Sequence, residues 1–250
     1  RYCCQMGALI MDTRFIVNFD YRTKNDDIQF SQIIEHFAFI IAQLNKLFQV
    51  EKNWYETGYS RKQALNQIAF QNGGITDNTR LKWERRYKKN MPMFVDSVWD
   101  ANDDEHSCGI SYRKMFYEQK NRVSVELSLV VNNDENSLLR FITLLSHLAL
   151  FFDCSHISID SNGYNLFGRN VFPDRLAVGW MLYIPHIVLT ELIPEAARVV
   201  PVMDGDNQKG TIIVSTEEIF DGNNKEHIGK ANDIEIKLLD LGLLPLMTEL

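Results

Sequence analysis

Two segments of the chain carry an apolar residue at every second position, and this period of two constrains the fold more than any other feature. Successive side chains of a strand point to opposite faces of a sheet, so each segment predicts a strand with one buried face. The apolar positions are Phe15, Val17, Phe19 and Tyr21 in residues 13–21, and Val123, Val125, Leu127, Leu129 and Val131 in residues 123–131.

Two other segments, 30–48 and 138–152, repeat apolar residues at helical spacing. Each predicts a long helix that lays a wide apolar face on the sheet. We expect Asp26 or Asp27 to cap the first helix, and Asn133 or Asp134 to cap the second. The apolar run 141–152 is shorter than the roughly 18 residues that cross a bilayer, so it predicts a buried helix.

Further elements follow from shorter patterns. Strands are predicted at 94–99, 109–117, 156–160, 176–184 and 198–203, and at 211–215 across a hairpin loop at 205–210. Ser60 and Gln63 fit a capping box that begins a helix to Phe70, and a last helix is predicted from Lys225 to Leu241. Parallel crossover units do not repeat, so the class is α+β: a largely antiparallel sheet flanked by helices, in a single domain whose division into two lobes stays open.

The length of 250 residues, with 45% hydrophobic and 24% charged, suits one folded domain. We predict that residues 12–250 form this domain and that residues 1–11 are a non-native or upstream leader, with Met11 as a native start. The cysteines Cys3, Cys4, Cys108 and Cys154 have neither the spacing of a zinc site nor that of a disulfide framework. We therefore expect a reducing, cytoplasmic location.

No catalytic motif stands out. There is no Gly-x-Ser-x-Gly elbow and no phosphate-binding glycine loop. Cys154 and His156 allow a thiolate–imidazole pair, but a small buried cysteine beside a partly exposed strand histidine is favoured. The run 204–207 resembles the start of a calcium loop, yet a solvated hairpin loop is favoured because Ser215 stands where the last ligand should be. We predict no enzyme activity, no metal site and no cofactor.

Charge offers two candidate binding surfaces. The net charge of −7 is concentrated in residues 151–250, which hold 7 basic and 15 acidic residues. Acidic loops could engage a basic partner, although plain surface acids explain them equally well. We take as candidate partner-binding residues Asp100, Asp103, Asp104, Glu105, Asp204, Asp206, Glu217, Glu218 and Asp221.

The second charged surface is a basic patch at 80–89, with Trp83 and Tyr87 among its cations. It could hold phosphates and stack bases, which gives the alternative function of a nucleic-acid-binding accessory protein. A solvated basic face anchored by the two aromatic residues is favoured. Its basic residues are Arg80, Lys82, Arg85, Arg86, Lys88 and Lys89.

The most distinctive segment is 171–185, with Pro173, Gly179, Trp180 and Tyr183. Together with 210–216, 227–245 and the spacing of Trp54, Gly58 and Ala64, it resembles the immunity protein 52 family of bacterial polymorphic toxin systems. The resemblance covers most of residues 13–245 and is sharpest after about residue 165. We interpret these residues as markers of the fold: a proline-fixed turn, a close backbone approach at glycine, and buried aromatic rings.

The resemblance implies an immunity protein, or antitoxin, that acts in interbacterial competition, including type VI secretion. Its partner would be a cognate effector toxin of the restriction-endonuclease type, neutralised by stoichiometric protein–protein binding. The acidic half suits such a nucleic-acid-binding partner and disfavours direct binding of nucleic acid by this chain. No membrane association is expected.

Overall fold

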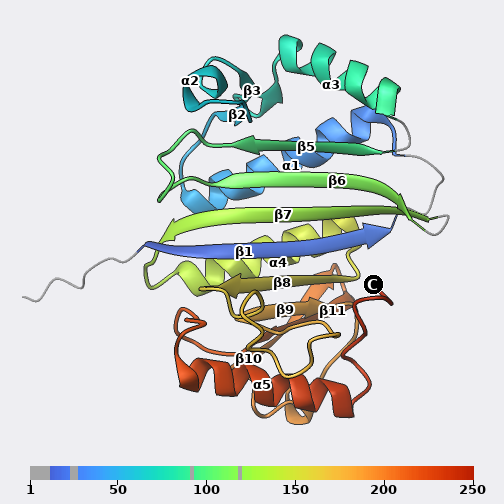
Figure 1. The fold of residues 1–250 in the computed structure, drawn as a ribbon. Helices are drawn as coiled ribbons and strands as arrows, with labels where there is room; N and C mark the ends of the chain where they lie inside the picture. The colour runs from blue at the N-terminus through green and yellow to red at the C-terminus, as the bar shows by residue number, and fades with distance from the viewer. Residues whose placement is uncertain (1–11, 23–27, 91–92, 118–119) are drawn as a thin grey trace, which may run out of the picture.

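The computed structural model describes residues 12–22, 28–90, 93–117 and 120–250. The leader expected at 1–11 and the helix caps expected at Asp26 and Asp27 lie outside these ranges. The described strands form one 11-stranded sheet in the order β10-β11-β9-β8-β1-β7-β6-β5-β2-β3-β4 (Figure 1). All its strand pairings are antiparallel, so the predicted α+β class with a single domain is confirmed.

The strands of the sheet are β1 (Asp12–Arg22), β2 (Trp54–Glu56), β3 (Ile68–Gln71), β4 (Gly74–Ile75), β5 (Phe94–Trp99), β6 (Gly109–Tyr117), β7 (Lys120–Asn132), β8 (His156–Ser161), β9 (Met181–Ile184), β10 (Arg198–Asp204) and β11 (Asn207–Val214). The helices are α1 (Phe30–Phe48), α2 (Arg61–Ala64), α3 (Asp77–Asn90), α4 (Ser137–Phe152) and α5 (Lys225–Asp240), with a 3-10 turn η1 (Thr190–Leu192).

Helices α1 and α4 cover one face of the sheet (Figure 1). The odd-numbered residues of β1 face these helices, and they pair in register with odd-numbered residues of β7 and β8. These side chains form the main core; Phe15, Val17 and Leu127 are fully buried in it. The period of two in the sequence thus produces the buried face that it predicts.

Helix α5 covers the opposite face, at the end of the sheet formed by β9, β11 and β10. A second apolar cluster fills this contact, with Leu182 of β9 and Ile213 of β11 packed near Ile234 and Leu238 of α5. Strand β9 is buried on both faces, which explains its unbroken apolar sequence. No described helix covers the same face over β1, β6 and β7 (Figure 1).

Three local predictions are wrong. The helix that begins after Ser60 ends at Ala64, and Phe70 lies in β3, where pairing with β2 outweighs the local helical pattern. Residues 176–180 are not strand, and β9 begins only at Met181. The N-cap of α4 is Asn136, although the Asp134 carboxylate does accept a hydrogen bond from the Asn136 N–H.

Candidate functional site

The uncovered face of the sheet carries a line of polar side chains across five adjacent strands. They occupy one register row because Ser97 pairs with Ser111, Ser111 with Glu126, Glu126 with Asn18, and Asn18 with Ser158. We call these five residues, Ser97, Ser111, Glu126, Asn18 and Ser158, the polar row. It comes from the non-apolar half of the alternation, since its members sit between the core residues of each strand.

A second cluster lies one row further along the same face, around Asp20. Its carboxylate accepts hydrogen bonds from Ser124 Oγ and from an Arg122 N–H at 2.6 Å. The His156 Nε2 atom lies 3.9 Å from the same carboxylate, and its Nδ1 atom lies 3.2 Å from Ser155 Oγ. Burial lowers the pKa of His156, opposed by Asp20 and reinforced by Arg122.

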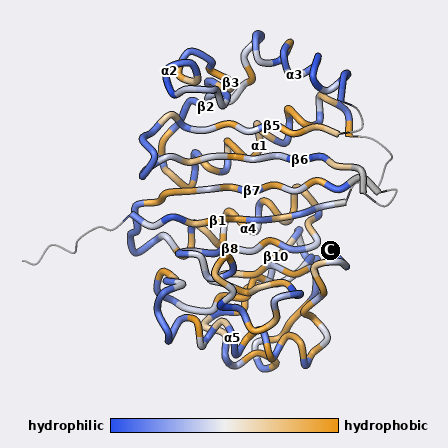
Figure 2. Tube along the Cα trace, in the orientation of Figure 1, coloured by the Kyte–Doolittle hydropathy of each residue, from blue (hydrophilic) through white to orange (hydrophobic). Residues whose placement is uncertain are grey.

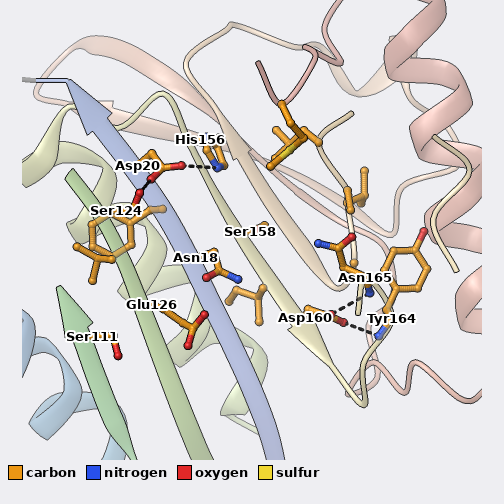
Figure 3. Close-up of a pocket in the computed structure, with 18 of the residues that line it drawn as sticks. Asn18, Asp20, Ser111, Ser124, Glu126, His156, Ser158, Asp160, Tyr164 and Asn165 are labelled. Carbon is orange, nitrogen blue, oxygen red and sulfur yellow. Dashed lines mark hydrogen bonds and ion pairs between the residues drawn. The ribbon is translucent and has the colours of Figure 1, made fainter. Parts of the chain in front are cut away.

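The order of Ser124, Asp20 and His156 differs from that of a hydrolytic triad. A hydrolytic triad needs the imidazole between the serine and the carboxylate, so that it can take the hydroxyl proton. Here the Asp20 carboxylate lies between Ser124 and His156 (Figure 3), and the serine hydroxyl donates to the carboxylate itself. Ser155 is the serine next to the His156 Nδ1 atom, and its hydroxyl donates to the Asp20 backbone carbonyl at 3.2 Å. Ser124, Arg122 and Asp20 therefore form a hydrogen-bonded ion pair and not a triad.

A cavity of about 210 Å³ opens over this face. Its far wall is the segment after β8, where the Asp160 carboxylate accepts hydrogen bonds from the N–H groups of Tyr164 (3.1 Å) and Asn165 (3.0 Å). Burial raises the pKa of Asp160 in spite of these bonds. Val178 and Met247 complete the wall on this side.

Several side chains that line the cavity have no hydrogen-bond or ion-pair partner among the described residues. They are Glu126, Asn18 and Ser158 of the polar row, and Arg113 of β6 in the neighbouring row. Figure 3 shows Asn18 and Glu126 side by side on the sheet, with Asp20 and Asp160 to either side. The site therefore has polar groups without a partner in its centre, between the hydrogen-bonded carboxylates of Asp20 and Asp160.

No metal centre is formed by the described part of the chain, in which no three His, Cys, Asp or Glu side chains come together. Nor is any described helix both long and apolar enough to span a membrane.

The first predicted acidic group divides into two parts. The Asp100 carboxylate is buried and bonded to Lys52 Nζ at 2.6 Å and to the Cys108 N–H, so our prediction of an exposed loop acid is wrong there. Asp103, Asp104 and Glu105 are exposed. Asp103 contacts the His106 imidazole, which lowers the pKa of Asp103 and raises that of His106.

The other acidic residues lie at both ends of the sheet. Glu217 and Glu218 follow β11 and are exposed. They lie at the same end of the sheet as residues 100–105, which follow β5. Glu217 accepts two hydrogen bonds from Arg198. Asp221 is partly buried and bonded to Asn162.

Asp204 and Asp206 lie in the β10–β11 hairpin, which is at the opposite end of the sheet because neighbouring strands are antiparallel. Only two residues, Gly205 and Asp206, separate these strands, so the hairpin loop is shorter than predicted.

The basic patch forms helix α3, which is largely hydrophilic in sequence (Figure 2). Trp83 and Tyr87 are buried and therefore hidden from any base. Lys82 forms an ion pair with the buried Glu56 carboxylate, and Arg86 lies 2.9 Å from the buried Asp96 carboxylate. These contacts fasten α3 to β2 and β5. Arg80, Arg85 and Lys89 remain exposed, and Lys88 pairs with Glu84.

Cys154 and His156 contact different partners: the His156 imidazole lies against Ser155 and Asp20. The Cys154 thiol is buried, contacts the Leu148 carbonyl, and has a raised pKa because of that burial. His156 is also buried, in contrast to our prediction of partial exposure, because the segment after β8 covers its strand.

The residues that carry the family resemblance have structural contacts. The Trp180 indole donates to the Thr216 carbonyl at 3.1 Å, and the Tyr183 hydroxyl donates to the Lys209 carbonyl at 3.4 Å. Gly179 has φ +57°, and a Cβ there would lie 2.6 Å from the Ile159 carbonyl oxygen.

The other three marker residues are also structural. Trp54 is fully buried, Gly58 packs on Ala64, and Pro173 lies in a turn.

Comparison with known proteins identifies a shared fold. The structure of the Pseudomonas aeruginosa T6SS protein PA0821 matches this chain with a TM-score of 0.56 and 10% sequence identity, over 93% of this chain and 79% of that protein. A second match, to a Trypanosoma brucei AdoMetDC-delta26 monomer, covers 81% of this chain and 63% of that one at 8% identity. Its TM-score of 0.17 is too low to indicate a common fold. No protein-family model and no curated protein matches the sequence.

Proposed function

We propose that this chain is an immunity protein of a type VI secretion system, which binds a cognate effector toxin and neutralises it. The observation that carries the proposal is the fold shared with the T6SS protein PA0821 along nearly the whole chain. The open polar face of the sheet adds support, because it leaves unpaired polar groups available to a partner.

The partner in this proposal is a nuclease of the restriction-endonuclease type, and the place of action is the cytoplasm. Two features support this choice: the resemblance of residues 171–185 to the immunity protein 52 family, and the acidic C-terminal part of the chain. A nuclease presents a basic surface to DNA, and an acidic protein is attracted to such a surface.

Inhibition by binding, without catalysis, is part of the proposal. The order of Ser124, Asp20 and His156 supports it, because the Ser124 hydroxyl donates to the Asp20 carboxylate and not to the His156 imidazole. The burial of Cys154 supports it as well.

The proposal is tested by co-expression in bacteria with the toxin encoded beside the gene, followed by purification through a tag on the toxin. We expect growth to be rescued and a stoichiometric complex to be recovered. An unrelated nuclease toxin serves as the control and should remain lethal. Cell death together with no co-purified protein would contradict the immunity function.

The acidic loops are tested separately, with Asp100 left intact because its buried carboxylate holds Lys52. One variant reverses Asp103, Asp104 and Glu105 to lysine, and another reverses Glu217 and Glu218. The matched control reverses Glu191 and Glu195, which are exposed and lie outside the candidate partner-binding residues. We expect weaker toxin binding in at least one of the first two variants. Unchanged affinity in both would exclude the acidic-loop mechanism without touching the immunity function.

A further inference from the structure

The carboxylates at the two sides of the cavity have hydrogen-bond partners, whereas the carboxylate at its centre has none among the described residues. Asp20 on one side is bonded to Arg122 and Ser124, and Asp160 on the other is bonded to two backbone N–H groups. Between them, the Glu126 carboxylate has no partner among the described residues. The free negative charge of the site is therefore at Glu126.

The neighbours of Glu126 add acceptors along a line. Asn18 and Ser111 are its register partners on β1 and β6, and Ser158 follows on β8. Their amide and hydroxyl oxygens, together with the carboxylate, match a planar group with several donors spread over one edge. A guanidinium group has five such donors and binds carboxylates through two of them.

A divalent metal ion fits the site less well. Such ions need several strong ligands converging on one point, and no such group of three is found in the described residues. The polar row is extended across strands that lie about 4.8 Å apart, which suits a flat organic cation better than a compact ion.

The segment that walls the cavity also fits a protein partner. Directly after Asn165 it presents Leu166 and Phe167, which are 81% and 64% exposed. Exposed apolar side chains beside a polar pocket are typical of protein interfaces, where apolar contacts surround one buried charged anchor.

We propose that the polar row is the receptor for an arginine side chain of the effector toxin, with Glu126 as its ion-pair partner. This inference rests on the proposed function and names the site that performs it. Arg113, one row away and also unpaired, lies close enough to oppose a cation in the cavity. Its removal should therefore strengthen binding, whereas removal of the Glu126 charge should weaken it.

The first test uses a probe and no toxin. The peptide acetyl-Gly-Arg-Gly-amide is titrated at millimolar concentrations into the labelled protein, and NMR shifts are followed at Ser111, Glu126 and Ser158. Acetyl-Gly-Gln-Gly-amide is the control ligand. We expect saturable shifts from the arginine peptide, weakened about tenfold or more in Glu126→Gln and strengthened in Arg113→Gln. The isosteric control Glu195→Gln changes another exposed glutamate and should have no effect.

Equal shifts from both peptides, or an unchanged affinity in Glu126→Gln, would overturn the proposal. Glu126 is exposed, so the variant should fold, and its NMR spectrum verifies this directly.

The second test measures the affinity of the toxin for the same variants. A weaker complex with Glu126→Gln and a stronger one with Arg113→Gln would support an arginine supplied by the toxin. If the toxin bound all variants equally, the immunity function would stand and the arginine receptor would be wrong. If the peptide bound as expected but wild-type protein formed no toxin complex, the proposed function would fail while the cation site remained.

Discussion

The Tyr164 hydroxyl donates a hydrogen bond of 2.9 Å to the carboxylate of Glu235, and both side chains are buried. Tyr164 belongs to the segment after β8, whereas Glu235 lies in α5. The same carboxylate accepts hydrogen bonds from the N–H groups of Val171 at 2.8 Å and Val178 at 3.0 Å. The Glu235 side chain of α5 thus forms hydrogen bonds with three residues, Tyr164, Val171 and Val178, of the segment that lines the cavity.

We predict that Glu235→Gln lowers the free energy of unfolding by about 1–3 kcal/mol, because an amide N–H₂ would then face a backbone N–H donor. Urea unfolding measures the loss, and hydrogen exchange should become faster at Val171 and Val178. The control Glu226→Gln changes an exposed residue of the same helix and should cost less than about 0.5 kcal/mol. Unchanged exchange at the two valines would contradict the role of Glu235.

Gly179 provides a second prediction, because its backbone combines a positive φ with a close contact. We expect Gly179→Ala to lower the free energy of unfolding by about 2–4 kcal/mol, since the new Cβ would meet the Ile159 carbonyl oxygen. Gly168 has φ +62° but open space around it, so Gly168→Ala should cost only about 1 kcal/mol. If thermal unfolding gave equal losses of stability for the two variants, the close contact between the new Cβ and the Ile159 carbonyl oxygen would contribute nothing to the cost.

The sequence predicts the centre of the fold well and its margins poorly. The alternation of β1 and β7 and the apolar stripes of α1 and α4 determine those elements, because each buries a whole face. The short strands β2, β3 and β4 have no pattern of that length. They are strands because they pair with one another and with β5, which is a tertiary cause that local spacing does not contain.

The candidate site was missed for a different reason. Glu126, Asn18 and Ser158 are ordinary polar residues on the outer side of predicted strands, and any solvated sheet has such residues. What distinguishes them is their shared register row, which depends on the strand order β7-β1-β8. The alternation could have identified the polar face, but only the topology brings the row together.

The buried thiols give a third prediction. Burial raises the pKa of Cys108 to about 11 and also raises that of Cys154, so neither has an appreciable thiolate fraction at pH 8. We expect neither residue to be alkylated by iodoacetamide in the native protein, and both to be alkylated in urea, as measured by peptide mass spectrometry. Rapid native alkylation of Cys154 would bring back the thiolate–imidazole hypothesis for Cys154 and His156.

Two titratable groups, one buried and one partly buried, should make stability depend on pH in opposite directions. Burial raises the pKa of Asp96 to about 7, against the attraction of Arg86, from an ordinary value of 3.8. Its contribution is therefore fully present below about pH 4 and is lost as the pH rises through 7. Burial lowers the pKa of His36 from 6.5 to about 4, and its Nδ1 atom lies 2.8 Å from the hydroxyl groups of Tyr21 and Tyr112. Its contribution is present above pH 6.5 and is lost as the pH falls through 4.

The two contributions offset each other between about pH 4 and 6.5, so the fourth prediction concerns differences between variants. The stability of wild type relative to Asp96→Asn should fall between pH 4 and 7 by on the order of 2–4 kcal/mol. Relative to His36→Gln, the stability of wild type should rise between pH 4 and 6.5 by on the order of 2–3 kcal/mol. Urea unfolding at a series of pH values measures both differences. A difference that stayed flat for Asp96→Asn would mean that Arg86 keeps the Asp96 carboxylate ionised throughout this range, and that the ion pair outweighs the cost of burial.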